Sequence, residues 1–183
     1  LSHADLSHAD LSHADLSHAD LSHALLDYTI LDYADLRWAI LHSTKMKRSS
    51  LHGAYLRMAH LEYTDLSMAD LSSTDLQKSN LDHTIFLKAD LSNASLIEAT
   101  LNCVNLCDAE LIHADLTSAS IIQTEITDGG LDRSIYLLKD FIAWDIKWVD
   151  IPFPLLVQHG ELIEDIDDDW YLLNNYDYNE NKF

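Results

Sequence analysis

Large apolar residues recur at every fifth position of the chain, from Leu1 to Ile151. Two positions before each of them, from Ala4 to Ser134, stands a second series made only of Ala, Ser, Thr, Val or Gly. In an α-helix a step of five residues turns by about 500°, so successive large residues would lie about 140° apart and form no apolar stripe. In a flat strand the same step sends them alternately to opposite faces. Neither regular element can therefore bury this pattern.

The pattern can be buried if the backbone turns a corner after every five residues. Four corners close a square coil, so one turn takes twenty residues. Small side chains then converge near the narrow axis, large ones fill the rest of the interior in layers, and the other three residues of each repeat point outward. Coils stacked at about 4.8 Å predict a rod whose stability is nearly additive over neighbouring coils.

The repeat resembles the A-(D/N)-L-x-x pattern of the pentapeptide-repeat family over residues 1–136. Three segments lie close to its consensus: Ala69-Asp70-Leu71, Ala89-Asp90-Leu91 and Ala114-Asp115-Leu116. The resemblance implies an all-β fold, a right-handed quadrilateral parallel β-helix of about seven coils. It also implies that the Leu and the small residue point inward.

We expect a β-helix domain over 1–151 and an acidic cap or tail over 152–183. Residues 1–24 are nearly identical copies of LSHAD, which a recent tandem expansion or a designed extension would explain. Residues 137–151 are expected to form an irregular last coil. The large series continues there at Phe141, Ile146 and Ile151, but the places of the small series hold Lys139, Trp144 and Val149.

The segment that follows the repeats is expected to be a short, partly helical C-terminal cap. Pro152 and Pro154 remove backbone donors and end the ladder. The stretch from Pro154 to Asp169 is interpreted as one or two short helical turns. A solenoid needs its open end covered, so we expect this segment to cap the rod. The alternative is that two chains form a homodimer through it. End-to-end stacking of coils would be a second way to form a homodimer.

The charge of the chain narrows its partners. It has 31 acidic and 11 basic residues among 183, a formal net charge of −20. Such a field repels nucleic acid and anionic membranes and favours basic partners, and no apolar run approaches the roughly 18 residues of a membrane-spanning helix. The two cysteines, Cys103 and Cys107, cannot form a disulfide framework, so we expect a cytoplasmic location. Because Leu1 is not Met, we expect a fragment, a processed chain or an engineered one, and export by a segment before it stays open.

The sequence contains no motif for catalysis. A Gly-rich phosphate loop, HExxH, G-x-S-x-G and a Cys/His pair are all missing, and leucines fill the rod, so we expect no enzymatic activity and no cofactor. A metal tract is suggested by His3, His8, His13, His18 and His23. Four of these residues fall on four different faces of the coil, so we expect no metal site.

Three groups of outward residues are candidates for binding a partner. The first is an aromatic and methionine patch, whose alternative role is to stabilise neighbouring coils by stacking: Tyr28, Tyr33, Trp38, Tyr55, Met58, Tyr63 and Met68. The second is an acidic ladder, whose alternative role is local bonding to the backbone: Asp70, Asp90 and Glu110. The third is a basic band, whose alternative role is to offset surrounding charge: Arg37, Lys45, Lys47, Arg48 and Arg57.

These features favour a non-enzymatic protein-interaction scaffold that presents ladders of side chains on a rigid rod. The family resemblance adds one alternative, a DNA mimic that binds a type II topoisomerase, which the rod and its negative charge suit and which the basic band weakens. The uniform first repeats favour another alternative, a purely structural or engineered solenoid. The sequence names no partner.

Overall fold

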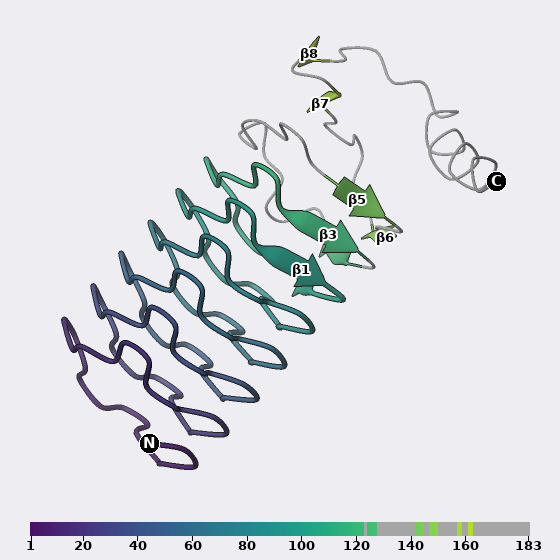
Figure 1. Cartoon of the computed structure of the whole chain (residues 1–183). Helices are drawn as coiled ribbons and strands as arrows, with labels where there is room; N and C mark the ends of the chain where they lie inside the picture. Colours follow the sequence, from purple (N-terminus) through teal and green to yellow (C-terminus); the bar gives the residue numbers. More distant parts are fainter. Residues whose placement is uncertain (123, 128–141, 145–146, 150–156, 159–160, 163–183) are drawn as a thin grey trace, which may run out of the picture.

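The chain forms a stack of coils in a computed structural model that describes residues 1–122, 124–127, 142–144, 147–149, 157–158 and 161–162. Each coil lies directly on the next (Figure 1), and parallel bridges join residues twenty positions apart, from Asp5↔Leu25 to Ser95↔Asp115. This spacing confirms the predicted turn of twenty residues. We call residues 21–40 coil 2, 41–60 coil 3 and 61–80 coil 4.

Longer strands appear only towards the later coils of the described part and continue the same stacking. One parallel sheet has the order β1-β3-β5, with β1 at Thr100–Asn102, β3 at Ser120–Ile122 and β5 at Ile142–Trp144. The other has the order β2-β4-β6, with β2 at Asn105–Leu106, β4 at Glu125–Thr127 and β6 at Lys147–Val149. The two sheets lie on successive sides of the coil, as the five-residue offset between their first strands requires.

The spacing changes after β3 and β4. Thr100 pairs with Ser120, twenty positions on, but Ser120 pairs with Ile142, which is twenty-two positions on. We expected an irregular last coil over residues 137–151, with the large series continuing at Phe141 and Ile146, and these two residues lie outside the described residues. Ile121 pairs with Ala143, so this turn is two residues longer than the turns before it. The shift takes Trp144 out of a place meant for a small side chain and puts it in register with Ile122, whose place is on the outside of the coil.

The expectation of helical turns between Pro154 and Asp169 is wrong at the four positions that the structure describes. There the chain forms a short antiparallel pair, β7 at Val157–Gln158 and β8 at Glu161–Leu162. The residues between the strands are His159 and Gly160, and a two-residue connection that contains Gly favours a hairpin. The rest of the expected cap lies outside the described residues, as do Tyr136 and Ile151.

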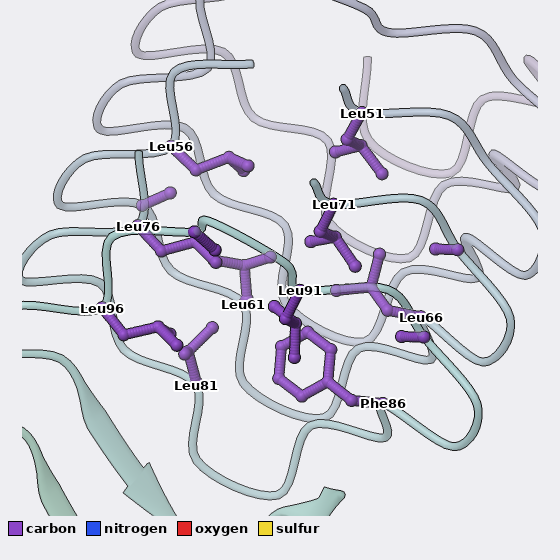
Figure 2. Close-up of a cluster of buried hydrophobic side chains, with 14 of the residues drawn as sticks. Leu51, Leu56, Leu61, Leu66, Leu71, Leu76, Leu81, Phe86, Leu91 and Leu96 are labelled. Atoms are coloured by element: carbon purple, nitrogen blue, oxygen red, sulfur yellow. The ribbon is translucent and has the colours of Figure 1, made fainter. Parts of the chain in front are cut away.

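The core consists of the two inward series. From Leu21 to Ile121 the large residues are at most 4% exposed, and Figure 2 shows Leu51, Leu71 and Leu91 stacked in successive layers, with Phe86 beside Leu91. The small places also hold Thr and Ser. Their hydroxyls donate to carbonyl oxygens, either three residues back, as from Thr44 to Leu41 at 2.9 Å, or in the preceding coil, as from Thr84 to Leu61 at 2.8 Å. These polar side chains therefore fit the interior without an unmet hydrogen bond.

Each corner is a β-turn with a left-handed residue in it. The amide of Ala4 donates to the carbonyl of Leu1 at 3.0 Å, and His3 between them has φ 61°. Every fifth residue from His3 to Ser118 has φ between 55° and 63°, and Gly53 is the only glycine among them. The left-handed conformation costs an L-residue roughly 1–2 kcal/mol. It is offset because the amide of that residue bonds to the next coil, as His3 does to Ser22 at 2.9 Å.

In many repeats a side chain accepts the amide of the residue after the large one. The amide of Ser72 donates to Asp70 at 2.9 Å and that of Cys107 donates to Asn105 at 2.9 Å, so the acceptor is the Asp or Asn that precedes the large residue. Where Lys45 takes that place, the acceptor is Asp27 of the preceding coil, which receives the amide of Lys47 at 2.8 Å. This bond explains why the repeat favours Asp and Asn before the Leu.

The same bonds hold the carboxyl groups of the first coil in their charged form. The pKa values of Asp10, Asp15 and Asp20 lie below the ordinary 3.8 because the hydroxyl of the following Ser and then its amide donate to the carboxylate. For Asp5 the amide of Ser7 is the larger cause of the lowered pKa and its hydroxyl the smaller. Since these pKa values are lower in the folded state, the stability that the bonds contribute is complete above pH 3.8 and is lost as pH falls below it.

We therefore expect a variant with Asn at positions 5, 10, 15 and 20 to lose less stability in acid than the wild type. The Asn side-chain oxygen accepts the same amide at any pH. Thermal unfolding followed by circular dichroism at pH 7 and pH 3 should show a smaller drop in midpoint for the variant. An equal drop in both proteins would contradict the assignment.

Candidate interaction surface

Outward side chains stack in columns on four faces of the coil. Each face consists of the residue before a buried large residue and the two residues after it. Face 1 is centred on Leu21, Leu41 and Leu61, face 2 on Leu26, Met46 and Leu66, face 3 on Leu31, Leu51 and Leu71, and face 4 on Leu36, Leu56 and Leu76. Faces 2 and 4 are half a turn apart and so lie on opposite sides of the rod.

Face 4 gathers three of the seven candidate aromatic and methionine residues. Trp38 follows Leu36 in coil 2, and Tyr55 and Met58 flank Leu56 in coil 3. Trp38 and Tyr55 are each 48% exposed, and Met58 is half-buried. Arg37 and Arg57 stand on the same face, both exposed. Trp, Tyr, Met and Arg are the residues enriched in protein–protein interfaces.

The other four candidates lie elsewhere. Tyr28 and Met68 belong to face 2, where Arg48 lies between them: its Nη1 is 3.5 Å from the Tyr28 hydroxyl and its Nε 3.4 Å from the Met68 sulfur. The guanidinium carbon also lies 5.8 Å from the centre of the Tyr28 ring. Tyr33 belongs to face 3 and Tyr63 to face 1. The predicted patch is therefore spread over four faces, and only face 4 brings several of its members together.

Tyr63 is part of a ring ladder along face 1 that the sequence analysis missed. Successive ring centres are 5.0 Å apart for His3 and His23, 5.8 Å for His23 and His42, 5.4 Å for His42 and Tyr63, and 4.6 Å for Tyr63 and His83. His42 occupies a different place in its repeat from the other four residues, so counting twenty-residue columns does not find it. These contacts support the alternative role for Tyr63, the stabilisation of neighbouring coils.

Tyr33 explains the one glycine at a left-handed corner. Its ring stacks on His13 at 5.3 Å and meets the edge of His52 at 5.4 Å. A Cβ added to Gly53 would lie 2.6 Å from Cε1 of Tyr33. Since the other corners accept side chains at the same φ, the glycine serves to make room for this ring rather than to permit the turn.

The basic band of the sequence is divided between opposite sides of the rod. Lys45, Lys47 and Arg48 stand on face 2, whereas Arg37 and Arg57 stand on face 4. Within residues 1–122 every Lys and Arg lies on one of these two faces: Lys45, Lys47, Arg48 and Lys88 on face 2, and Arg37, Arg57 and Lys78 on face 4. Faces 1 and 3 carry no basic side chain other than His over this range.

Several basic residues are paired with carboxylates. Arg37 pairs with Asp35, Lys47 with Asp65 at 3.1 Å and Lys78 with Glu98 at 3.1 Å. These are exposed pairs, which water and salt screen, so they contribute little to stability. Arg37 and Lys47 are members of the basic band, and their charges are offset locally, which is consistent with the alternative considered for the band.

The acidic ladder stands on face 3. Asp70 bridges to Asp90 and Asp90 to Glu110, so the three residues stack in adjacent coils. Asp70 accepts the amide of Ser72 at 2.9 Å, and Asp90 accepts that of Ser92 at 2.8 Å. Both carboxylates therefore also serve the local backbone, which is the alternative considered for this ladder. Glu110 is exposed.

Two findings concern metal ions and membranes, and both are restricted to the described residues. No group of three or more His, Cys, Asp or Glu residues is placed to hold a metal ion. No helix in this part of the chain is both long and apolar enough to cross a membrane.

Comparison with known families identifies the repeat. The sequence model of the pentapeptide repeats matches in eight copies, over residues 4–42, 49–86 and 89–128. The chain belongs to the pentapeptide-repeat family. The stacked coils are therefore a right-handed β-helix. None of the curated protein sequences matches this chain.

Solved structures similar to this pentapeptide-repeat chain include proteins of varied biological setting. HetL of the cyanobacterium Nostoc, involved in the regulation of heterocyst differentiation, is 25% identical over 80% of this chain and 84% of its own, with a TM-score of 0.36. A pentapeptide repeat protein of the Arabidopsis thaliana thylakoid lumen is 26% identical over 56% of this chain and 68% of its own (TM-score 0.34). QnrB1, a plasmid-mediated fluoroquinolone resistance protein, is 18% identical over 76% and 78% (TM-score 0.39).

Proposed function

We propose that this pentapeptide-repeat chain is a non-enzymatic interaction scaffold that binds a partner protein through face 4 of coils 2 and 3. The observation that supports it is the exposure of Trp38 and Tyr55, at 48% each, beside Met58, Arg37 and Arg57. One side of the Trp38 ring stacks on His18, with the ring centres 6.1 Å apart, as exposed rings on the other faces stack on histidines or contact Arg48, and about half of the Trp38 side chain is still exposed. Face 4 therefore combines the composition of an interface with a rigid backbone.

The exposed area of Trp38 and Tyr55 is large enough for these residues to contribute much of the free energy of binding to a partner. A Trp or Tyr side chain buries roughly 150–250 Å² when fully covered. Covering the exposed half of each ring then contributes about 2 kcal/mol, at about 25 cal/mol/Å². Because the β-helix already fixes the backbone on which these residues stand, little ordering is needed on binding. Such centres dominate the affinity of many interfaces.

We expect the double variant Trp38→Ala/Met58→Ala to lose a partner protein that the wild type captures. The reason is that it removes apolar area from face 4 without touching the core. The measurement is affinity capture from cell extract, with photo-crosslinking from position 55 to identify the protein in contact.

Tyr63→Ala is the matched control, since Tyr63 is an aromatic residue exposed at 55% on another face. It should keep the partner, and crosslinking from position 63 should not capture it. Identical partner profiles for the double variant and the wild type would refute an interface on face 4 and favour the purely structural or engineered solenoid.

A second candidate function, a DNA mimic for a type II topoisomerase, is favoured by the segregation of charge. The basic residues that would interrupt a DNA-like track stand on faces 2 and 4, which leaves faces 1 and 3 without Lys or Arg over residues 1–122. Face 3 carries the ladder Asp70, Asp90 and Glu110. The net charge of −20 gives the field the sign of DNA.

If this second function holds, added protein should inhibit DNA supercoiling by gyrase or protect gyrase from poisoning by a quinolone. Asp90→Asn should weaken either effect, because it removes a charge yet keeps an acceptor for the amide of Ser92. The readout is the topoisomer distribution on an agarose gel. Supercoiling and poisoning that are both unaffected by the wild-type protein would rule the function out.

Dimerisation through residues 152–183 and a cytoplasmic location remain predictions from the sequence. For the first, analytical sedimentation should show a dimer for the whole chain and a monomer for a chain that ends at Asp150. If both chains sediment with the same number of subunits, residues 152–183 have no role in dimerisation. For the second, fractionation of the source cells is the test.

A further inference from the structure

Two repeats on face 4 share one layout and differ in one residue. In coil 2 the outward residues around Leu36 are Asp35 and Arg37, and in coil 3 those around Leu56 are Tyr55 and Arg57. Asp35 and Tyr55 are bridge partners, so they stand one above the other. The pair of repeats is therefore a natural comparison of an Arg with and without a carboxylate beside it.

In coil 2 the carboxylate of Asp35 forms an ion pair with the guanidinium of Arg37. Its Oδ1 accepts the Nε of Arg37 at 2.8 Å, and its Oδ2 accepts the Nη2 of the same guanidinium at 2.5 Å. The amide of Arg37 also donates to Oδ1 of Asp35 at 3.1 Å. The planar donor fork of Arg37 is therefore engaged on one edge by its own neighbour.

In coil 3 a phenol ring stands where that carboxylate would be. Among the described residues no carboxylate lies within ion-pair distance of Arg57. Asp75, the next residue of the column beyond Tyr55, accepts the amide of Gln77 at 3.1 Å instead. The N–H donors of the Arg57 guanidinium are therefore not bound by a carboxylate of the described residues, although the protein has 31 acidic residues.

The surroundings of Arg57 favour a carboxylate that arrives with apolar neighbours. The backbone carbonyl of Arg57 accepts the amide of Trp38 at 3.1 Å, so the two residues belong to adjacent coils in direct contact. Tyr55 and Met58 complete an apolar rim. A partner that covers this rim excludes water and strengthens a charge-assisted bond made inside it.

The negative charge of the whole protein does not prevent this contact. At physiological ionic strength the Debye length is about 8 Å, so charges on the other faces are largely screened. On face 4 itself Arg37 with Asp35 and Lys78 with Glu98 are neutral as pairs, whereas Asp75 of the next coil accepts the amide of Gln77 and keeps its charge. Among the described residues Arg57 is the cation of this face that has no paired carboxylate.

We propose that Arg57 is the anchor of the interface on face 4 and receives a carboxylate from an acidic peptide segment of the partner, in which Asp or Glu adjoins apolar residues. This inference rests on the proposed function and deepens it. The partner's aromatic or aliphatic residues cover Trp38, Tyr55 and Met58 while its carboxylate binds the guanidinium.

The test uses the full chain and a phage-displayed library of random twelve-residue peptides. Peptides selected on the wild type should be enriched in Asp or Glu beside aromatic or aliphatic residues. Their affinity should fall at least about tenfold for Arg57→Gln, since a hydrogen bond to a charged group is removed. Arg48→Gln is the matched control, since it removes an exposed Arg from face 2 on the opposite side of the rod, and it should bind within about twofold of the wild type.

Tyr55→Asp is the sharper variant, because it restores in coil 3 the arrangement of Asp35 and Arg37. The new carboxylate should engage Arg57 and its amide, so peptide binding is lost while the thermal midpoint stays equal or rises. Peptides without acidic enrichment, or peptides that bind Tyr55→Asp or Arg57→Gln as well as the wild type, would overturn the proposal. A library that yields no binder would overturn it as well.

Two further outcomes separate this inference from the proposed function and from an internal ligand. If the selected peptides require Trp38 and Met58 but not Arg57, the interface on face 4 is supported and the role of Arg57 as its anchor is refuted. Selected peptides that resemble residues 161–172 (ELIEDIDDDWYL) would assign the site to the chain's own acidic segment, and the proposal of a separate partner would fall.

Discussion

The hydrogen bonds between the backbones of successive coils are the interaction on which the whole molecule depends. They fix the twenty-residue turn, and they offset the left-handed conformation that every corner imposes on residues such as His3 and Ser118. The amide of the residue after each large one is left out of this ladder. In many repeats this amide donates instead to Asp or Asn before the large residue, or to an Asp of the preceding coil. The recurrent Asp therefore stabilises the backbone of the coil, and its contribution to the negative surface charge is a consequence of that role.

Strict stacking converts sequence columns into surfaces. Rings twenty residues apart lie face to face, as Tyr63 and His83 do, and residues ten apart lie on opposite sides of the rod. A basic cluster that is compact in the sequence is therefore separated in space. The same geometry leaves faces 1 and 3 without Lys or Arg over residues 1–122, and it places on face 4 the paired Arg37 beside Arg57, which has no carboxylate partner among the described residues.

Departures from the repeat are the most informative positions of such a chain. Where Asp follows the consensus, as at Asp35, it serves its own backbone and its neighbouring side chain. Where Tyr55 replaces Asp, there is no carboxylate to accept the backbone amide or the guanidinium of Arg57, and the Tyr55 ring and the Arg57 side chain are both exposed on the same face. A regular β-helix can tolerate this exchange because each repeat contacts mainly its neighbours in the stack.

The sequence alone determined the square coil, its inward series and the length of its turn, because a five-residue period can be buried in no regular helix or strand. It also located all the outward aromatic and basic residues, but not how they group, since grouping depends on stacking and on where side chains lean. The ladder through His42 and Tyr63, the room that Gly53 leaves for Tyr33 and the isolation of Arg57 required the tertiary structure. So did the two-residue shift at β5, because the place of Trp144 depends on the coil beneath it.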